Sequence, residues 1–282
     1  MTMDVARTRL QRSVAGAPQP AAALRSGFTL VELLVVIVIL AMLASLVTPA
    51  IMNSLTKARN SAIKAEIDML HMALMNYQSE YGAVPPCVEP TNYWTTGQYT
   101  RGGPAAKHLQ RLFPRCGDTA YQLNNVNNPN PPSPNPNPIV QLTQKNALVA
   151  WLAGFTPDPI NPLLPGSLRV KLYDFERARI DSSTAAYHPS GKKGSPYIYF
   201  DAGSYGSLAG LPAQDNRKSF ADGGNAYKPE YIKDPSGTAT EFFNATTFQI
   251  LCAGRDEQWG TEDDLSNFWP GTRVEYERSL KN

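Results

Sequence analysis

The stretch Gly27-Phe28-Thr29-Leu30-Val31-Glu32-Leu33-Leu34 decides how this chain folds, because it opens an apolar run that continues almost unbroken to Ile51. That run exceeds the roughly 20 residues that a helix needs to cross a hydrocarbon core of about 30 Å. A carboxylate inside such a helix costs roughly 2.5 to 3.5 kcal/mol on insertion scales. Glu32 is therefore expected to have a positive partner, and the nearest one is an amino group made by cutting the chain just before Phe28.

Two simpler interpretations of the same segment are open. An ordinary secretory signal also has a basic segment before an apolar run, but its cleavage site follows the apolar run at small residues. An uncleaved signal anchor fits the hydropathy too, with Ala41 to Ser45 as its small-residue stretch. Neither interpretation explains an acid inside the apolar run, so Glu32 favours cleavage between Gly27 and Phe28.

Basic residues before the apolar run indicate its orientation. Residues 1–27 contain four arginines, which favour a cytoplasmic amino end and place the chain after about Ile51 outside the cytoplasm. The whole chain has a net charge of +2, and residues 1–27, with their arginines and Asp4, contribute +3 of it. The remainder is left at about −1, so no basic footprint for a nucleic acid remains.

The helical pattern continues beyond the apolar run. Apolar side chains recur at spacings of three and four residues, which is one stripe of an amphipathic helix; they are Ile63, Ile67, Leu70, Leu74, Tyr77 and Tyr81. The polar side of this helix is expected to hold Lys57, Arg59, Lys64, Glu66, Asp68 and Glu80.

A single helix from Phe28 to Tyr81 would be about 80 Å long at 1.5 Å per residue, which is far longer than a bilayer is thick. Pro49 is expected to kink it, because proline removes one backbone hydrogen bond. Tyr81-Gly82 and the following Pro85-Pro86 give the signals that end a helix.

The middle of the chain, residues 83–146, shows no compact pattern. Asn124 to Pro138 consists almost wholly of asparagine and proline, so it cannot bury enough apolar surface to offset its ordering entropy. We expect a solvated, partly polyproline-like loop that acts as a linker rather than as a recognition segment.

The three cysteines lie outside the membrane in this topology, where disulfides are permitted. Cys87 and Cys116 could close a loop in the middle region, which would leave Cys252 as a buried thiol in an apolar segment. The odd count leaves three reduced thiols as the alternative.

Residues 147–282 predict a small head. Ala147 to Ala153 reads as a short helix that ends at Gly154. Leu168–Tyr173, Pro196–Phe200 and Thr247–Cys252 are strand candidates between turns rich in glycine, proline and asparagine. A long helix followed by a small antiparallel sheet is an α+β arrangement.

An acidic stretch from Ala253 to Leu265 follows the last strand candidate. It holds five acids within nine residues, which would repel one another in a fixed turn, and a hard cation such as calcium relieves this repulsion through carboxylate and carbonyl ligands. The spacing is not that of an EF-hand. A solvated acidic turn without metal is the alternative interpretation.

The order of Gly27, Phe28 and Glu32 resembles the class III signal of type IV prepilins and of type II secretion pseudopilins, over about Arg25 to Tyr81. The resemblance implies that a prepilin peptidase cuts between Gly27 and Phe28 and methylates the new terminus, which makes Glu32 the fifth mature residue. Pro49 falls where pilins commonly carry a proline.

This family resemblance implies a type IV pilin-like fold, in which a long amino-terminal spine helix carries a small antiparallel head. The expected segments are a leader over 1–27, a transmembrane helix over 28–51, an extramembrane amphipathic helix over 52–82, a variable Pro/Asn-rich region over 83–146 and an extracytoplasmic α+β head over 147–282.

The acidic stretch resembles the calcium loop of the major pseudopilin, in which a first Asp and a later Asp pair embrace the ion. Carried over by position, the implied ligands are Asp256, Asp263 and Asp264. A glycine often follows the first Asp in that family, and Glu257 stands there in this chain.

Motifs for catalysis are absent from the sequence, which has no G-x-S-x-G elbow and no P-loop. His71, His108 and His188 are scattered and are expected on a helix face or in loops, so zinc is not indicated. The chain is expected not to be an enzyme.

We therefore predict a filament subunit, most like the major pseudopilin of type II protein secretion. It would reside in the inner membrane as a single-pass protein with a periplasmic head. Its expected partners are itself, the peptidase, the membrane and the inner-membrane assembly platform, with Glu32 meeting the Phe28 amine of a neighbour. The alternatives are a true or minor type IV pilin and, from another class, a membrane-anchored calcium-dependent binding module.

Overall fold

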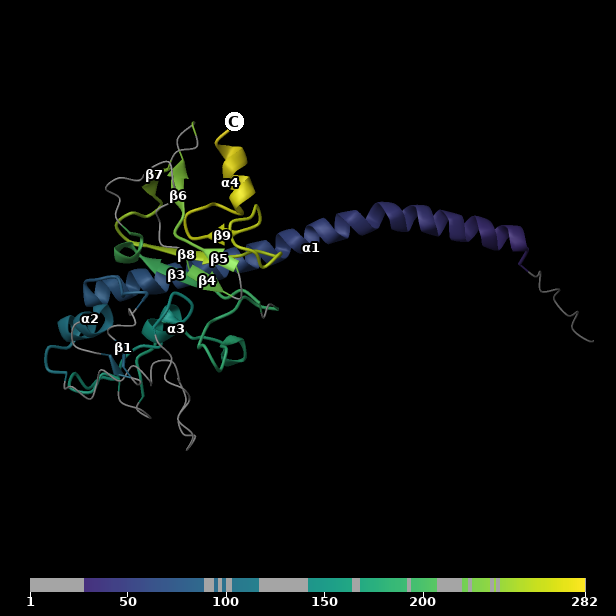
Figure 1. Cartoon of the computed structure of the whole chain (residues 1–282). Coiled ribbons are helices and arrows are strands. Elements are labelled where there is room, and N and C mark those ends of the chain that lie inside the picture. The colour runs from purple at the N-terminus through teal and green to yellow at the C-terminus, as the bar shows by residue number, and fades with distance from the viewer. Residues whose placement is uncertain are drawn as a thin grey trace, which may run out of the picture. The chain divides into compact units, whose positions relative to one another are not determined.

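The structure is a computed structural model that describes residues 28–88, 94–95, 98–99, 103–116, 142–163, 168–191, 194–206, 220–222, 225–233, 236 and 239–281. The predictions for the leader, for Gly27 and for the Asn124 to Pro138 loop lie outside these residues. The chain divides into two compact units, residues 1–53 and 54–282. Figure 1 shows the elements of both.

Helix α1 (Leu30–Tyr81) has the predicted extent to within two residues. Its apolar amino-terminal part reaches a mean hydropathy of 3.0, and within the described residues α1 is the one helix long and apolar enough to cross a membrane. It stays helical through Pro49; the kink is still a prediction. The helix ends as predicted at Gly82, which adopts a positive φ of 71° and donates its N–H to Gln78.

The carboxyl-terminal half of α1 carries the core stripe that the sequence predicted. Ile67, Leu70 and Tyr77 are completely buried, and Tyr81 is half-buried beside them. Glu66, which the sequence analysis placed on the polar side, is instead buried. It sits between Ile63 and Ile67, at the edge of the apolar stripe, where a charged group can be buried only with partners.

The central sheet has three antiparallel strands in the order β3 (Ile198–Asp201), β8 (Phe248–Cys252) and β9 (Leu265–Ser266). Tyr199 pairs with Ile250, and Cys252 pairs with Leu265. Every residue of β8 is buried, so the continuous apolar run of this strand fits its central place. The predicted α+β, pilin-like arrangement is confirmed, with two of the three strand candidates in this sheet.

Smaller elements surround this sheet. Three two-stranded ribbons pair β1 (Trp94–Thr95) with β2 (Gln98–Tyr99), β4 (Phe220–Asp222) with β5 (Asn225–Tyr227), and β6 (Tyr231–Lys233) with β7 (Ala239–Phe242). The short helices are α2 (Pro104–Leu112), α3 (Ala147–Leu152) and α4 (Arg273–Ser279), with two single 3-10 turns, η4 (Arg177–Arg179) and η5 (Ala202–Ser204). Helix α3 was predicted, and Gly154 ends it with a φ of 79°.

The third strand candidate, Leu168–Tyr173, is wrong. The segment makes a single isolated bridge between Val170 and Phe155, and Leu168 is 91% exposed. The N–H groups of Leu172 and Tyr173 both donate to the carbonyl of Leu152, at the end of α3. The segment therefore gives its hydrogen bonds to the carbonyl groups at the end of a helix instead of to a neighbouring strand. Alternation of residues in the sequence does not reveal which hydrogen-bond partner is available.

The structure also places His108 and the three cysteines. His108 is buried on α2, and its Nε2 lies 2.8 Å from the Tyr77 hydroxyl. Cys252 is a buried thiol in β8, and Cys87 is buried as well; all three cysteines are free, as the alternative of three reduced thiols predicted. No disulfide joins Cys87 to Cys116 in the described part of the chain.

Candidate assembly helix and acidic loop

Within the described residues, Glu32 lies at the amino terminus of α1 with no cation near it in the sequence. Thr29 caps the helix: its N–H and its hydroxyl both donate to the Glu32 carboxylate, at 2.8 and 2.9 Å, and the Glu32 N–H donates back to the Thr29 hydroxyl at 3.1 Å. Toward the carboxyl end the next charged residue is Lys57, and toward the amino end it is Arg25, which lies outside the described residues. Within the described residues, Thr29 satisfies the carboxylate with hydrogen bonds, and the structure shows no counter-charge for it there.

The acidic loop joins β8 to β9 and wraps around the side chain of Asp263. The Asp263 carboxylate accepts the backbone N–H groups of Arg255 and Asp256, at 2.5 and 3.1 Å, and the Thr261 hydroxyl at 2.8 Å. Gly254 has a φ of 61°, and a Cβ there would collide with the Asp263 backbone. Close approach of two backbone segments thus requires glycine at this position.

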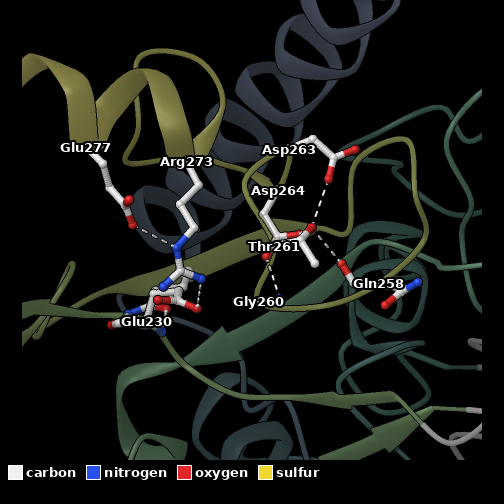
Figure 2. Close-up of polar contacts among 9 residues, drawn as sticks. Glu230, Gln258, Gly260, Thr261, Asp263, Asp264, Arg273 and Glu277 are labelled. Atoms are coloured by element: carbon white, nitrogen blue, oxygen red, sulfur yellow. Dashed lines mark hydrogen bonds and ion pairs between the residues drawn. The ribbon is translucent and has the colours of Figure 1, made fainter.

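Asp264 is the buried acid of the loop. Its side chain accepts the Gly260 N–H at 2.7 Å and lies 3.5 Å from the Thr261 hydroxyl (Figure 2). Burial raises the pKa of Asp264 to about 7, and the charges of Glu230 and Asp263 add to the rise. A bound cation would relieve the repulsion between this buried carboxylate and its acidic neighbours.

Asp256 does not join the other two predicted ligands. Its exposed carboxylate accepts the Gln258 N–H at 2.8 Å, within its own turn. The structure thus brings Asp263 and Asp264 together at Thr261, and among the residues it describes there is no group of three or more acidic, histidine or cysteine side chains arranged to hold a metal. The calcium ligands are still a prediction.

Glu257, where the resembled family often has glycine, adopts a positive φ of 59°. A non-glycine residue in this left-handed region carries backbone strain of order 1 kcal/mol or more. The position therefore has the backbone geometry that favours glycine, although the chain has a glutamate there.

Helix α4 is built onto the acidic loop. The N–H groups of Arg273 and Val274 donate to the carbonyls of Asp264 and Glu262, both at 2.9 Å. The Arg273 side chain bridges Glu230 and Glu277, each at 3.3 Å (Figure 2). Sequence analysis missed this helix, although Thr272 and Glu275 form a capping box with the spacing that marks a helix start.

A second buried charge fixes α1 within the head, and sequence analysis missed it. The Glu66 carboxylate accepts hydrogen bonds from Arg179 at 2.5 Å, Tyr197 at 2.6 Å and Tyr187 at 2.8 Å. Burial alone would raise the pKa of Glu66, but the hydrogen bonds from Arg179 and both tyrosines, together with the Arg179 charge, leave that pKa below its ordinary value. The signal was the position of Glu66 on the edge of the apolar stripe.

Comparisons with known proteins found one family model and two relatives. The family model for the prokaryotic N-terminal methylation motif matches residues 23–48, which include Gly27, Phe28 and Glu32. The chain is 36% identical over 103 residues to type II secretion system core protein G of Pectobacterium carotovorum subsp. carotovorum, across 35% of this chain and 66% of that protein. It is 41% identical over 61 residues to the protein of the same name from Pseudomonas aeruginosa (strain PAO1), across 22% of this chain and 43% of that protein.

These matches span somewhat less than two thirds of the first relative and less than half of the second. No solved structure matches the chain significantly.

Proposed function

Because the methylation motif and the two relatives support membership of the pseudopilin and type IV pilin-like family, we propose that this chain is a structural subunit of a type II secretion pseudopilus. Its activity is assembly rather than catalysis, in keeping with a structural family. The relatives favour a pseudopilin over a true pilus subunit, and they do not favour a membrane-anchored binding module.

One observation carries the proposal. The motif places Glu32 near the start of an exposed apolar helix in which no residue between it and Lys57 is charged. An acid in that setting is costly for a simple anchor. A neighbouring subunit whose chain starts at Phe28 offers a free amine at the depth of the acid, so each contact pairs two charges that are otherwise uncompensated in the bilayer.

The same setting implies the route to assembly. The helix fits a single-pass inner-membrane protein. We infer that the amino end faces the cytoplasm, because of the arginines in residues 1–27, and that the head is periplasmic. Prepilin peptidase would cut after Gly27, and the assembly platform of the inner membrane would extract the processed subunit into the filament.

We propose further that the acidic loop binds calcium through Asp263 and Asp264, with Asp256 as a third ligand. The donor set suits a hard cation, because it consists of carboxylates, and the buried Asp264 has acidic neighbours. Bound calcium would supply the counter-charge. For Asp256 to take part, its carboxylate must exchange the Gln258 N–H for the ion.

Mass spectrometry of the mature amino terminus tests the proposed function. The chain isolated from membranes should begin at an N-methylated Phe28. An intact leader, or a terminus beyond Thr48, would refute processing by prepilin peptidase.

A further inference from the structure

The carboxyl-terminal side of the head carries an apolar groove between the β6–β7 hairpin and α4. The groove has a volume of about 570 Å³, and its apolar lining includes Ile232, Phe243, Trp269, Tyr276 and Leu280. Ile232 is 39% exposed and Leu280 is 67% exposed. Single exposed apolar residues need no explanation, but several that line one groove mark a surface for a partner.

The charged groups of this groove call for an acidic occupant. The two acids of the groove, Glu230 and Glu277, are both paired with Arg273. Lys233 and Lys281 also line the groove; Lys233 lies over the Tyr231 ring, and neither lysine forms an ion pair within the described part of the chain.

A complementary projection lies elsewhere on the same unit. We define the apolar loop as residues 156–163, which follow α3; Ile160 is 51% exposed within it, and Asp158 is its one charged residue. The loop is held rigidly. Thr156 donates its N–H to Pro162 at 2.9 Å, and the Asp158 carboxylate accepts the Ile160 N–H at 2.9 Å and the Asn161 side-chain amide at 3.0 Å.

This projection offers what the groove lacks. Hydrogen bonds from the Asn161 side chain and the Ile160 N–H lower the pKa of Asp158, so its carboxylate is charged at neutral pH. A preorganised turn that presents one isoleucine and one carboxylate loses little conformational freedom on docking. Lys233 and Lys281 in the lining of the groove are complementary to its charge.

The positions of the groove and of the apolar loop on the subunit determine whether their contact gives a closed dimer or an open polymer. Figure 1 shows α4 with the β6–β7 hairpin on one side of α1 and α3 on the other, within the head unit. Two different surfaces on opposite sides of a subunit form a head-to-tail contact, which generates an open helical assembly when it does not close into a ring.

We propose that the groove between α4 and the β6–β7 hairpin receives the apolar loop of a second copy of this chain, with Ile160 on the apolar floor and Asp158 between Lys233 and Lys281. This contact rests on the proposed filament function and adds an interface between neighbouring heads to the contacts of the membrane helices.

Charge exchange in the full chain tests this contact. Filaments are sheared from cells and quantified. Asp158→Lys and the double variant Lys233→Glu/Lys281→Glu should each lower the yield about tenfold or more, and combining all three changes should restore it. Asp158→Asn keeps an acceptor for the Ile160 N–H and should also lower the yield, which separates loss of charge from loss of the turn. Asp174→Lys reverses another exposed acid and should have no effect.

Cross-linking identifies the occupant. In a Cys116→Ser background, which removes the partly exposed native thiol, Ile160→Cys and Ile232→Cys in one chain should give a ladder of covalent oligomers with a short bifunctional maleimide in assembled filaments. Neither single variant in that background should give the ladder. Normal filaments with neutral charge variants and no ladder would overturn the contact but leave the filament function standing. A cross-link from Ile232→Cys to a different protein would also overturn it, whereas absence of any wild-type filament would refute the filament function itself.

Discussion

The Glu66 carboxylate on α1 lies 2.5 Å from the Arg179 guanidinium in the turn η4, and both side chains are largely buried. Tyr187 and Tyr197 also donate hydrogen bonds to the acid, and the Tyr173 hydroxyl lies 3.5 Å from it. The Arg179 guanidinium lies over the Tyr187 ring. This cluster joins the helix to residues more than a hundred positions later. It fixes α1 in one rotation against the head, because a buried charge is tolerated only where all of its partners meet.

Removing one partner should be costly. Glu66→Ala leaves Arg179 without its carboxylate and two tyrosine hydroxyls without an acceptor, so we expect a loss of about 3 kcal/mol in the free energy of unfolding. Denaturant unfolding of the full chain in mild detergent measures it. Lys171→Ala, which breaks the exposed Lys171–Asp174 pair, is the matched control and should cost less than about 1 kcal/mol. Equal losses of unfolding free energy in the two variants would show that the buried Glu66 cluster stabilises the head no more than an exposed ion pair does.

Acid should weaken the head through His108. Burial, aided by the Arg111 charge, lowers the pKa of His108 to about 4 from 6.5. Between these values the unfolded chain binds a proton at His108 that the folded chain does not, so the contribution of His108 to stability is complete above about pH 6.5 and is lost as the pH drops toward 4. Asp264, whose pKa is raised, contributes with the opposite sign in this range, so the His108 contribution is read from the difference between wild type and a His108 variant. The full difference corresponds to about 3 kcal/mol.

Denaturant unfolding between pH 7 and pH 4 checks this dependence. His108→Gln removes the titration of this residue, so the stability lost by wild type relative to the variant between pH 6.5 and pH 4 should equal the His108 contribution. The contribution of Glu66 should remain in that variant, because its lowered pKa also makes stability fall with acid, at lower pH. A variant with an unchanged profile would rule out His108 as the source.

Filament assembly should depend on Glu32. Glu32→Ala removes an intramembrane charge, so insertion and processing should be unaffected or improved, whereas the contact with the neighbouring amine is lost. The sheared-filament fraction should therefore vanish while the processed subunit accumulates in membranes. Thr48→Ala, a polar change in the same helix, is the control. Normal assembly of Glu32→Ala would contradict the proposed charge contact.

How much the sequence could predict depends on how local each feature is. The long helix, its end at Gly82 and the buried stripe around Ile67 follow from hydrophobic periodicity and from the residues that terminate a helix. Leu168–Tyr173 failed because alternation does not reveal whether a neighbouring strand is present.

The candidate site divides in the same way. Glu32 could be identified because an acid within an apolar run is visible in the sequence without knowledge of the tertiary structure. The acidic loop was located, but its hydrogen bonds were not, since the partners of Asp263 and Asp264 depend on backbone turns. The place of Glu66 in the stripe hints at its burial, but its partners come from segments far away in the sequence, and local pattern carries no information about them.

Calcium should stabilise the acidic loop and, through it, helix α4. A ligand at a hundredfold excess over its Kd adds about 2.7 kcal/mol, which a thermal unfolding curve of the full chain in detergent reveals as a shift between millimolar calcium and excess chelator. Asp263→Asn keeps an acceptor for the Arg255 and Asp256 N–H groups but removes the charge, so it should abolish most of the shift without unfolding the loop. Glu241→Ala, which removes an exposed acid on β7, should keep the full shift.

The same samples report on α4, because the Arg273 and Val274 N–H groups donate to carbonyls of the loop. Their hydrogen exchange should slow in calcium, and Asp263→Asn should remove the slowing. Wild-type protein that melts at the same temperature with calcium and with chelator would identify the segment as a solvated acidic turn. A full shift retained by Asp263→Asn would place the cation elsewhere and contradict the proposed ligands.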